Sequence, residues 1–178
     1  ATHGMRVRRG HTNFDHDPMR LWRNNGDGTF TEVAGAMGLD HIGVGRGVAT
    51  FDADGDGDHD VLLTHNLDAP VLYRNDVGVA EDGTGNAWLE VQPQGTTSNR
   101  DGMGAIVRLV PEDGAAPMIR LSGNGCGFLA HTPGTPHFGL GSLESVARIE
   151  VFFPASGRTA VLTDVPTRQR LVVVEPDA

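Results

Sequence analysis

The acidic stretch between Phe51 and Val61 constrains the fold of this chain more than any other feature of its sequence. It places aspartates on five alternate positions: Asp52, Asp54, Asp56, Asp58 and Asp60. In a tight loop these carboxylates would repel one another and disfavour the folded turn. A hard cation reverses the sign of that effect, and calcium takes about six to eight oxygen ligands. The spacing therefore predicts a calcium-binding loop.

The predicted ligands follow alternate positions of the loop. We expect side-chain oxygens from Asp52, Asp54, Asp56 and Asp60, and the backbone carbonyl of Asp58. Gly57 occupies the position at which such a loop must turn sharply. Leu63 stands where an EF-hand would have a bidentate glutamate, and both flanks look like strands, so the loop is not an EF-hand. A solvated acidic turn without an ion and a magnesium site are the alternatives.

Short apolar segments bounded by Gly, Pro, Asn or Asp fill most of the remaining chain and predict many short strands. The 178 residues include 25 glycines and 10 prolines. We expect strands near residues 5–7, 20–23, 30–33, 48–51, 61–64, 71–74, 88–91, 105–110, 118–121, 146–153, 159–162 and 170–174. The turn at 24–30 has few carboxylates, so we expect a hairpin there and not a cation site. The best helix candidate is short, residues 32–37, and ends at Gly38.

The first half of the chain repeats itself. Leu21-Trp22-Arg23-Asn24 returns as Leu72-Tyr73-Arg74-Asn75, an offset of 51 residues. A period near 50 residues is typical of propeller blades, and about four or more blades are needed to close a propeller. The incomplete repeat leaves strand edges and an apolar face uncovered, and we expect Val61, Leu63 and Leu72 on that face. We therefore expect residues 1–80 to contact other protein subunits or a second copy of the chain.

Composition excludes several classes of function. The formal net charge of −9 disfavours nucleic acid as a partner. The apolar run at 171–174 is far shorter than the roughly 20 residues of a membrane-spanning helix, so we expect no membrane span. A single cysteine, Cys126, excludes a disulfide within the chain. Residues 81–85 are polar and glycine-rich, and they predict a linker between a repeat segment (1–80) and a second domain (86–178).

No catalytic constellation is visible in the sequence. There is no GxSxG elbow and no P-loop. Asp101 and His137 could form an acid–base pair, but the sequence favours a turn at residues 99–101 and a strand cap at His137. We therefore expect no catalytic residue.

Two groups of motifs resemble known families. Residues 20–33 and 47–75 resemble an FG-GAP/VCBS repeat, whose DxDxDGxxD pattern matches Asp52, Asp54, Asp56, Gly57 and Asp60. Residues 86–175 resemble an ASPIC/UnbV domain through Ser98-Asn99-Arg100-Asp101-Gly102-Met103-Gly104-Ala105, Ser122-Gly123-Asn124-Gly125 and His137-Phe138-Gly139-Leu140-Gly141. The order of the two resembles the cartilage acidic protein-like family. The resemblance implies calcium binding, an extracytoplasmic location and interaction or matrix roles.

These observations predict an all-β protein in two parts. A partial β-propeller-like repeat segment with a Ca2+ loop precedes an antiparallel β-sandwich of immunoglobulin-like or transthyretin-like type. The expected function is that of a calcium-stabilised, non-catalytic structural or interaction module, an accessory subunit docked on a larger protein assembly. The expected location is periplasmic or extracellular. The alternatives are a carbohydrate-active lyase or hydrolase and a carbohydrate-binding module.

Overall fold

The computed structural model describes residues 18–66, 68–76, 85–123 and 126–177, and within them the predicted all-β class is confirmed. The first half contains β1 (Trp22–Asn24), β2 (Phe30–Glu32), β3 (Gly45–Phe51), β4 (Asp60–His65) and β5 (Val71–Tyr73). The second half contains β6 (Ala87–Gln94), β7 (Ile106–Pro111), β8 (Met118–Leu121), β9 (Cys126–Gly127), β10 (Ala130–His131), β11 (His137–Gly141), β12 (Ser145–Phe153), β13 (Arg158–Pro166) and β14 (Gln169–Val174). In these ranges no helix has the length and apolar character needed to span a membrane.

The short helix expected at residues 32–37 forms only as a 3₁₀ turn, η2 (Gly35–Met37). Gly38 ends it with a φ of 74°, in the left-handed region that glycine adopts without a steric cost. The predicted end is therefore confirmed, but the turn is too short to be an α-helix.

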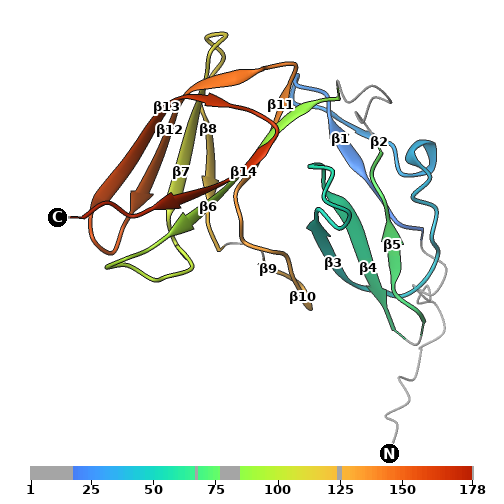
Figure 1. Cartoon of the computed structure of the whole chain (residues 1–178). Coiled ribbons are helices and arrows are strands. Elements are labelled where there is room, and N and C mark those ends of the chain that lie inside the picture. Colours follow the sequence, from blue (N-terminus) through green and yellow to red (C-terminus); the bar gives the residue numbers. More distant parts are fainter. Residues whose placement is uncertain (1–17, 67, 77–84, 124–125, 178) are drawn as a thin grey trace, which may run out of the picture.

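Five of the six strands expected in the repeat half lie within the described residues, and the one near residues 5–7 lies outside them. β1 and β2 form the hairpin expected at 24–30. The Asp27 carboxylate closes its turn by accepting the hydroxyl (2.6 Å) and the backbone N–H (2.9 Å) of Thr29, and these bonds lower the pKa of Asp27. β3, β4 and β5 form a separate antiparallel sheet (Figure 1).

The register of β4 and β5 corrects the predicted apolar face. Leu62 lies opposite Leu72, and Leu63 lies opposite Val71. Cross-strand partners share a face, and successive residues of a strand alternate between faces. Val61 and Leu63 therefore lie on one face of the sheet and Leu72 on the other. Leu63 is buried whereas Leu72 is 52% exposed, so the three residues do not form a common surface.

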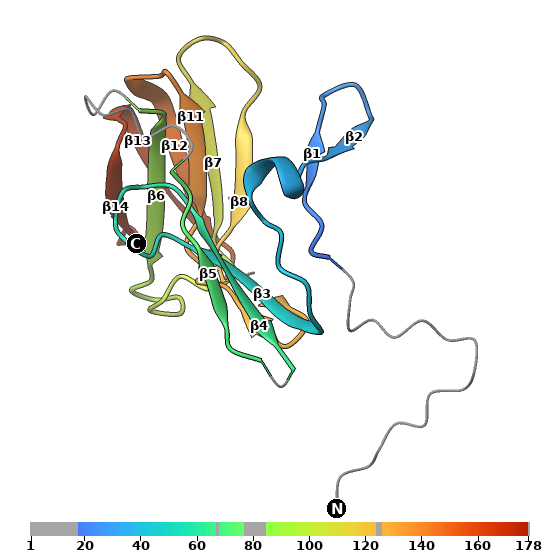
Figure 2. The ribbon, with the colours of Figure 1, turned by 90° about the vertical axis from the view of Figure 1, so that its right-hand side faces the viewer.

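The second half is a two-layered sandwich. One layer is the sheet β13-β12-β7-β8, and the other is the sheet β11-β6-β14 (Figures 1 and 2). One pairing departs from the expected antiparallel order, because β14 runs parallel to β6 with Leu171 opposite Val91. These are the first and last strands of the sandwich, so the chain between them is long enough for the crossover that a parallel pair requires.

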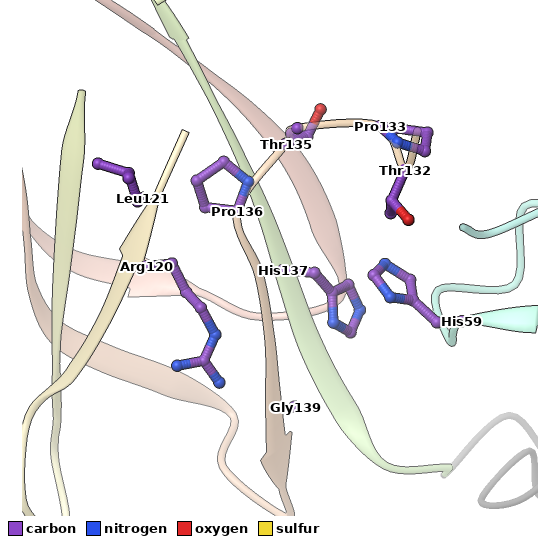
Figure 3. Close-up of a pocket in the computed structure, with 10 residues that line it drawn as sticks. His59, Arg120, Leu121, Thr132, Pro133, Thr135, Pro136, His137 and Gly139 are labelled. Atoms are coloured by element: carbon purple, nitrogen blue, oxygen red, sulfur yellow. The ribbon is translucent and has the colours of Figure 1, made fainter. Parts of the chain in front are cut away.

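The two halves of the chain contact each other, among other places, at the β9–β10 hairpin and at the loop that precedes β4. The β9–β10 hairpin lies against β3, and a Cβ on Gly47 would come 2.9 Å from the Leu129 carbonyl oxygen. The loop that precedes β4 meets β11, where the rings of His59 and His137 are 4.2 Å apart (Figure 3). Part of the β3 edge, expected to be bare, is thus covered by the sandwich of the same chain.

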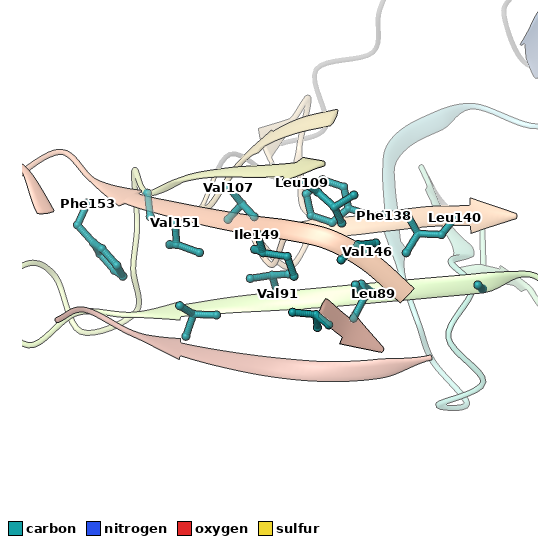
Figure 4. Packing of buried hydrophobic residues seen from close by; sticks show 14 residues of the cluster. Leu89, Val91, Val107, Leu109, Phe138, Leu140, Val146, Ile149, Val151 and Phe153 are labelled. Atoms are coloured by element: carbon teal, nitrogen blue, oxygen red, sulfur yellow. The ribbon is translucent and has the colours of Figure 1, made fainter. Parts of the chain in front are cut away.

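The main hydrophobic core lies between the two layers of the sandwich (Figure 4). Burial alternates along the strands: in β6, Ala87, Leu89 and Val91 point inward while Trp88 and Glu90 are only half-buried. The largest fully buried apolar side chains are Leu89, Val91, Val107, Leu109, Phe138, Val146, Ile149, Val151 and Phe153.

A buried carboxylate fastens the C-terminal end of the sandwich. Glu175 accepts backbone N–H groups at 2.8 Å from Thr96, Thr97 and Ser98. Burial alone would raise the pKa of Glu175, but hydrogen bonds from Ser156, Ser98 and Thr96 together lower it below its usual range. The loop that begins at Ser98 in the sequence motif is therefore anchored by this carboxylate.

Candidate metal centre

The acidic loop, residues 52–60, joins β3 to β4 and is organised around its first carboxylate. Asp52 accepts the N–H of Gly55 through Oδ1 at 2.6 Å and the N–H of Gly57 through Oδ2 at 3.1 Å. Gly55 and Gly57 have φ values of 87° and 98°, which side chains other than glycine rarely adopt. These two turns fold the loop back toward Asp52.

Three carboxylates of the loop converge. One oxygen from each of Asp52, Asp54 and Asp60 lies within 4.8 Å of the other two. Asp60 is buried, and its two oxygens accept the N–H groups of Ala53 and Asn75, both at 2.8 Å. Like charges at this separation oppose one another unless a positive charge lies among them.

The other two predicted ligands lie differently. Asp56 is outside the converging group, and its Oδ1 accepts the N–H of Asp58 at 3.1 Å. Both carboxylate oxygens of Asp58 are shielded from solvent and accept no hydrogen bond from the described residues. Burial, and then the charges of the neighbouring aspartates, raise the pKa of Asp58 to about 6. From the sequence we expected Asp58 to bind the ion through its backbone carbonyl. In the structure it is the side-chain carboxylate of Asp58 that lacks a hydrogen-bond donor among the described residues.

Two arginines from outside the loop balance part of its charge. Arg170 of β14 places Nη2 2.7 Å from Asp52 Oδ2 and Nε 2.7 Å from Glu90 Oε2. The Glu90 charge and the hydrogen bond to Asp52 raise the pKa of Arg170. Arg74 lies 4.0 Å from Asp54. The sequence analysis missed Arg170 because it is 118 positions from Asp52, and no local motif marks such a pair.

The converging donors are all carboxylate oxygens. Hard divalent cations prefer oxygen ligands, whereas zinc and copper sites use imidazole and thiolate groups. Within the described ranges, Asp52, Asp54 and Asp60 are the one group of three or more acidic, histidine or cysteine side chains close enough to hold a metal ion. The residues fit a hard cation, and the orphaned carboxylate of Asp58 is a group that such a cation would stabilise.

A hollow of about 370 Å³ lies beside the acidic loop (Figure 3). It is lined mainly by His59, Arg120, His137 and residues 132–136, with no carboxylate and no Trp, Tyr or Phe among the lining residues. Burial, and then the proximity of His137, lower the pKa of His59. A glycosidase would need a pair of carboxylates. The hollow offers neither that pair nor an aromatic surface on which a sugar could stack.

The two residues considered for acid–base chemistry have separate roles. Asp101 lies in the predicted turn, where its N–H donates to Asn99 Oδ1 at 3.0 Å. His137 lies on β11, and its Nε2–H donates to the Gly57 carbonyl oxygen at 2.8 Å. The turn is confirmed, whereas the contact between His137 and the acidic loop was not predicted.

Comparison with known families supports the resemblance seen in the motifs. The FG-GAP-like repeat model matches residues 11–63, which include the acidic loop. The ASPIC and UnbV model matches residues 95–178. Neither is a typical catalytic family.

Three similar curated proteins share the name cartilage acidic protein 1. Cartilage acidic protein 1 of Mus musculus and that of Homo sapiens are each 32% identical over 135 residues, which is 74% of this chain and 20% and 19% of theirs. The Xenopus tropicalis protein of that name is 34% identical over 112 residues, 63% of this chain and 16% of its own length. The chain thus spans about a fifth of the length of the curated relatives it matches.

Proposed function

We propose that the chain is a calcium-stabilised interaction module. The premise is that an FG-GAP-like repeat here precedes an ASPIC and UnbV domain. Residues 1–80 form the repeat segment, 81–85 the linker and 86–178 the sandwich domain. The module is non-catalytic and acts as an accessory part of a larger protein assembly. Its location is periplasmic or extracellular.

The observation that carries this proposal is the arrangement of the acidic loop. Three carboxylates converge within 4.8 Å, and the carboxylate oxygens of the nearby Asp58 are shielded from solvent without a donor among the described residues. In our proposal Asp52, Asp54 and Asp60 hold the ion, and Asp56 and Asp58 complete its oxygen shell. Calcium fits better than magnesium because it accepts more protein oxygens in a less regular geometry. The bound ion would supply the positive charge that makes this loop stable.

A protein partner is supported by the apolar side chains that the repeat half leaves exposed. Trp22, Phe30 and Leu72 are each more than half exposed. Aromatic residues are enriched in protein interfaces, whose fully buried centre is more apolar than the rest of the surface. The name of the relatives, cartilage acidic protein, supports a location outside the cell. The hollow beside the loop does not support the carbohydrate alternatives, because its lining has neither carboxylates nor aromatic rings other than imidazoles.

Thermal unfolding of the full chain tests the calcium proposal. A ligand that binds only the folded state at about 100 times its Kd stabilises it by about 2.7 kcal/mol. For a chain of this length each kcal/mol shifts Tm by about 2–4 °C. We therefore expect added calcium to raise Tm by about 5–10 °C over the chelated protein, and magnesium at the same concentration to raise it less.

Substitutions identify the site. Asp54→Ala together with Asp56→Ala should abolish the calcium-dependent shift. Asp27→Ala is a matched control, because Asp27 also closes a glycine-rich turn through its carboxylate but lies in the β1–β2 hairpin. That control should keep the full shift. If Tm of the unsubstituted chain is unchanged by both chelator and calcium, the proposed function is wrong.

A further inference from the structure

The outer face of the sheet β11-β6-β14 carries a row of polar side chains that contacts the acidic loop. His137 of β11 lies opposite Glu90 of β6, and Glu90 lies opposite Arg170 of β14. Cross-strand partners share a face, so these three side chains stand side by side. Arg170 contacts Asp52 from one end of the row, and His137 contacts the Gly57 carbonyl from the other. The row therefore touches the loop near its start and at its central turn.

Trp88 closes the contact at the central turn. A Cβ on Gly57 would lie 1.9 Å from two atoms of the Trp88 indole, so only glycine permits this approach. The Trp88 ring is nearly parallel to the His137 ring, at 13° and a centroid distance of 6.3 Å. Gly57 is thus held between an indole beside its Cα and an imidazole N–H on its carbonyl.

The held turn is linked directly to the converging carboxylates. The Gly57 N–H donates to Asp52 Oδ2, and Asp58 follows Gly57 in the chain. A displacement of Gly57 would therefore move a hydrogen-bond donor of Asp52 and the backbone that carries Asp58. Both residues are part of the ion site proposed above.

We propose that Trp88 and His137 are positioning residues for the ion site: the sandwich holds the turn of the acidic loop in the conformation that gathers its carboxylates. Ion binding and the contact between the two halves are then coupled, so each strengthens the other. This inference rests on the proposed function, because it requires that the loop binds calcium.

Calorimetric titration of calcium into the full chain and its variants tests the coupling. His137→Ala removes the donor to Gly57 and should weaken calcium binding about tenfold, since groups that hold a metal ligand in place typically contribute 10- to 100-fold to metal affinity. His137→Gln keeps an N–H donor at a similar reach and should restore most of the affinity. If the imidazole acted only by packing its ring beside Trp88, Gln would not restore the calcium affinity.

The chain offers a matched control in His65. Its ring also pairs with a second imidazole, His41, at 4.0 Å, and its Nδ1 contacts the Ala69 carbonyl oxygen at 3.3 Å. It lies at the end of β4 remote from the acidic loop. His65→Ala should therefore leave the calcium affinity within about twofold of the unsubstituted chain, although it breaks the same kinds of contact.

Terbium luminescence provides an independent measurement on the same site. Terbium replaces calcium in oxygen sites and emits when a nearby indole is excited. We expect the signal to survive Trp22→Phe and to be lost in Trp88→Phe, a conservative change that keeps an aromatic ring in the contact. Loss in Trp22→Phe instead, or no loss in Trp88→Phe, would show that Trp88 does not lie at the ion site.

The outcomes separate the two proposals. If the unsubstituted chain binds neither calcium nor terbium, the proposed function fails and this inference fails with it. If it binds both ions and folded His137→Ala binds calcium as tightly as the unsubstituted chain, the calcium site stands and the positioning role is wrong. Should His137→Ala not fold, calorimetric titration of calcium into Trp88→Ala decides the inference, because an unchanged calcium affinity would show that the indole does not position the loop.

Discussion

Replacement of Gly57 by alanine should destabilise the protein more than the same replacement at Gly55. The two glycines lie two residues apart in the acidic loop, and their φ values, 98° and 87°, are both in the left-handed region. Each donates its N–H to the Asp52 carboxylate. They differ in the space for a Cβ, because a Cβ on Gly55 meets nothing within 4 Å whereas a Cβ on Gly57 meets Trp88 at 1.9 Å.

The magnitude follows from these two observations. An alanine forced into the left-handed region costs about 1–2 kcal/mol, and both variants carry this cost. Gly57→Ala must in addition displace the Trp88 indole, and extra atoms in a packed contact cost about 1–3 kcal/mol. We therefore expect the free energy of unfolding to fall by about 1–2 kcal/mol in Gly55→Ala and by about 2–5 kcal/mol in Gly57→Ala.

Urea unfolding at equilibrium, followed by tryptophan fluorescence and by circular dichroism, measures both values. The chelator should be present throughout, so that ion binding does not contribute to either variant. In the Trp88→Ala background the additional cost of Gly57→Ala should disappear, and the two glycine variants should become equal. Equal destabilisation of the two single variants with Trp88 in place would refute the claim that the indole packs on Gly57.

Two further predictions concern the sandwich. The pKa of Glu175 is lowered in the folded state, so its contribution to stability is fully present above the carboxylate pKa of the unfolded chain and is lost progressively as pH falls from there toward the lower pKa of the folded state. The gap in urea midpoint between Glu175→Gln and the unsubstituted chain should therefore shrink between pH 7 and pH 3. A gap of the same size at both pH values would contradict the ionised assignment. Phe138→Ala should lower the free energy of unfolding by about 3–5 kcal/mol, because the Phe138 ring is fully buried in the core. A loss below about 1 kcal/mol would show that the core does not close around it.

The strands of the sandwich could be predicted because their sequence pattern is local. Residues 118–121 were expected as a strand and form β8 with the same bounds, and 146–153 differ from β12 by one residue. Alternating apolar residues between turn-forming residues are sufficient for this. Pairing is not local: the parallel contact of β14 with β6 depends on how the whole sandwich closes. The placement of Leu72 failed for the same reason, since a register shift of one residue exchanges the two faces of a strand.

The ion site, too, could be predicted from the sequence only where its features are local. All five aspartates were visible in the sequence because they fall within nine consecutive residues. Their individual roles were not visible: the convergence of Asp52, Asp54 and Asp60 depends on how the loop turns, and the shielding of the Asp58 carboxylate oxygens depends on what covers them. Whether Asp56 and Asp58 act as ligands remains a prediction.

The outward residues of β6 explain why the acidic loop lies where it does. Alternation places Trp88 and Glu90 on the face opposite to the core residues Leu89 and Val91, where a sandwich domain normally meets solvent. A tryptophan on an outer face needs a neighbour that covers it. That neighbour is the backbone at Gly57, which only a glycine turn can bring so close. On the same face Arg170 bonds to Glu90 and to Asp52, so the sheet contributes one positive charge to a loop with five carboxylates. One arginine cannot neutralise five carboxylates, and a divalent cation would supply two further positive charges.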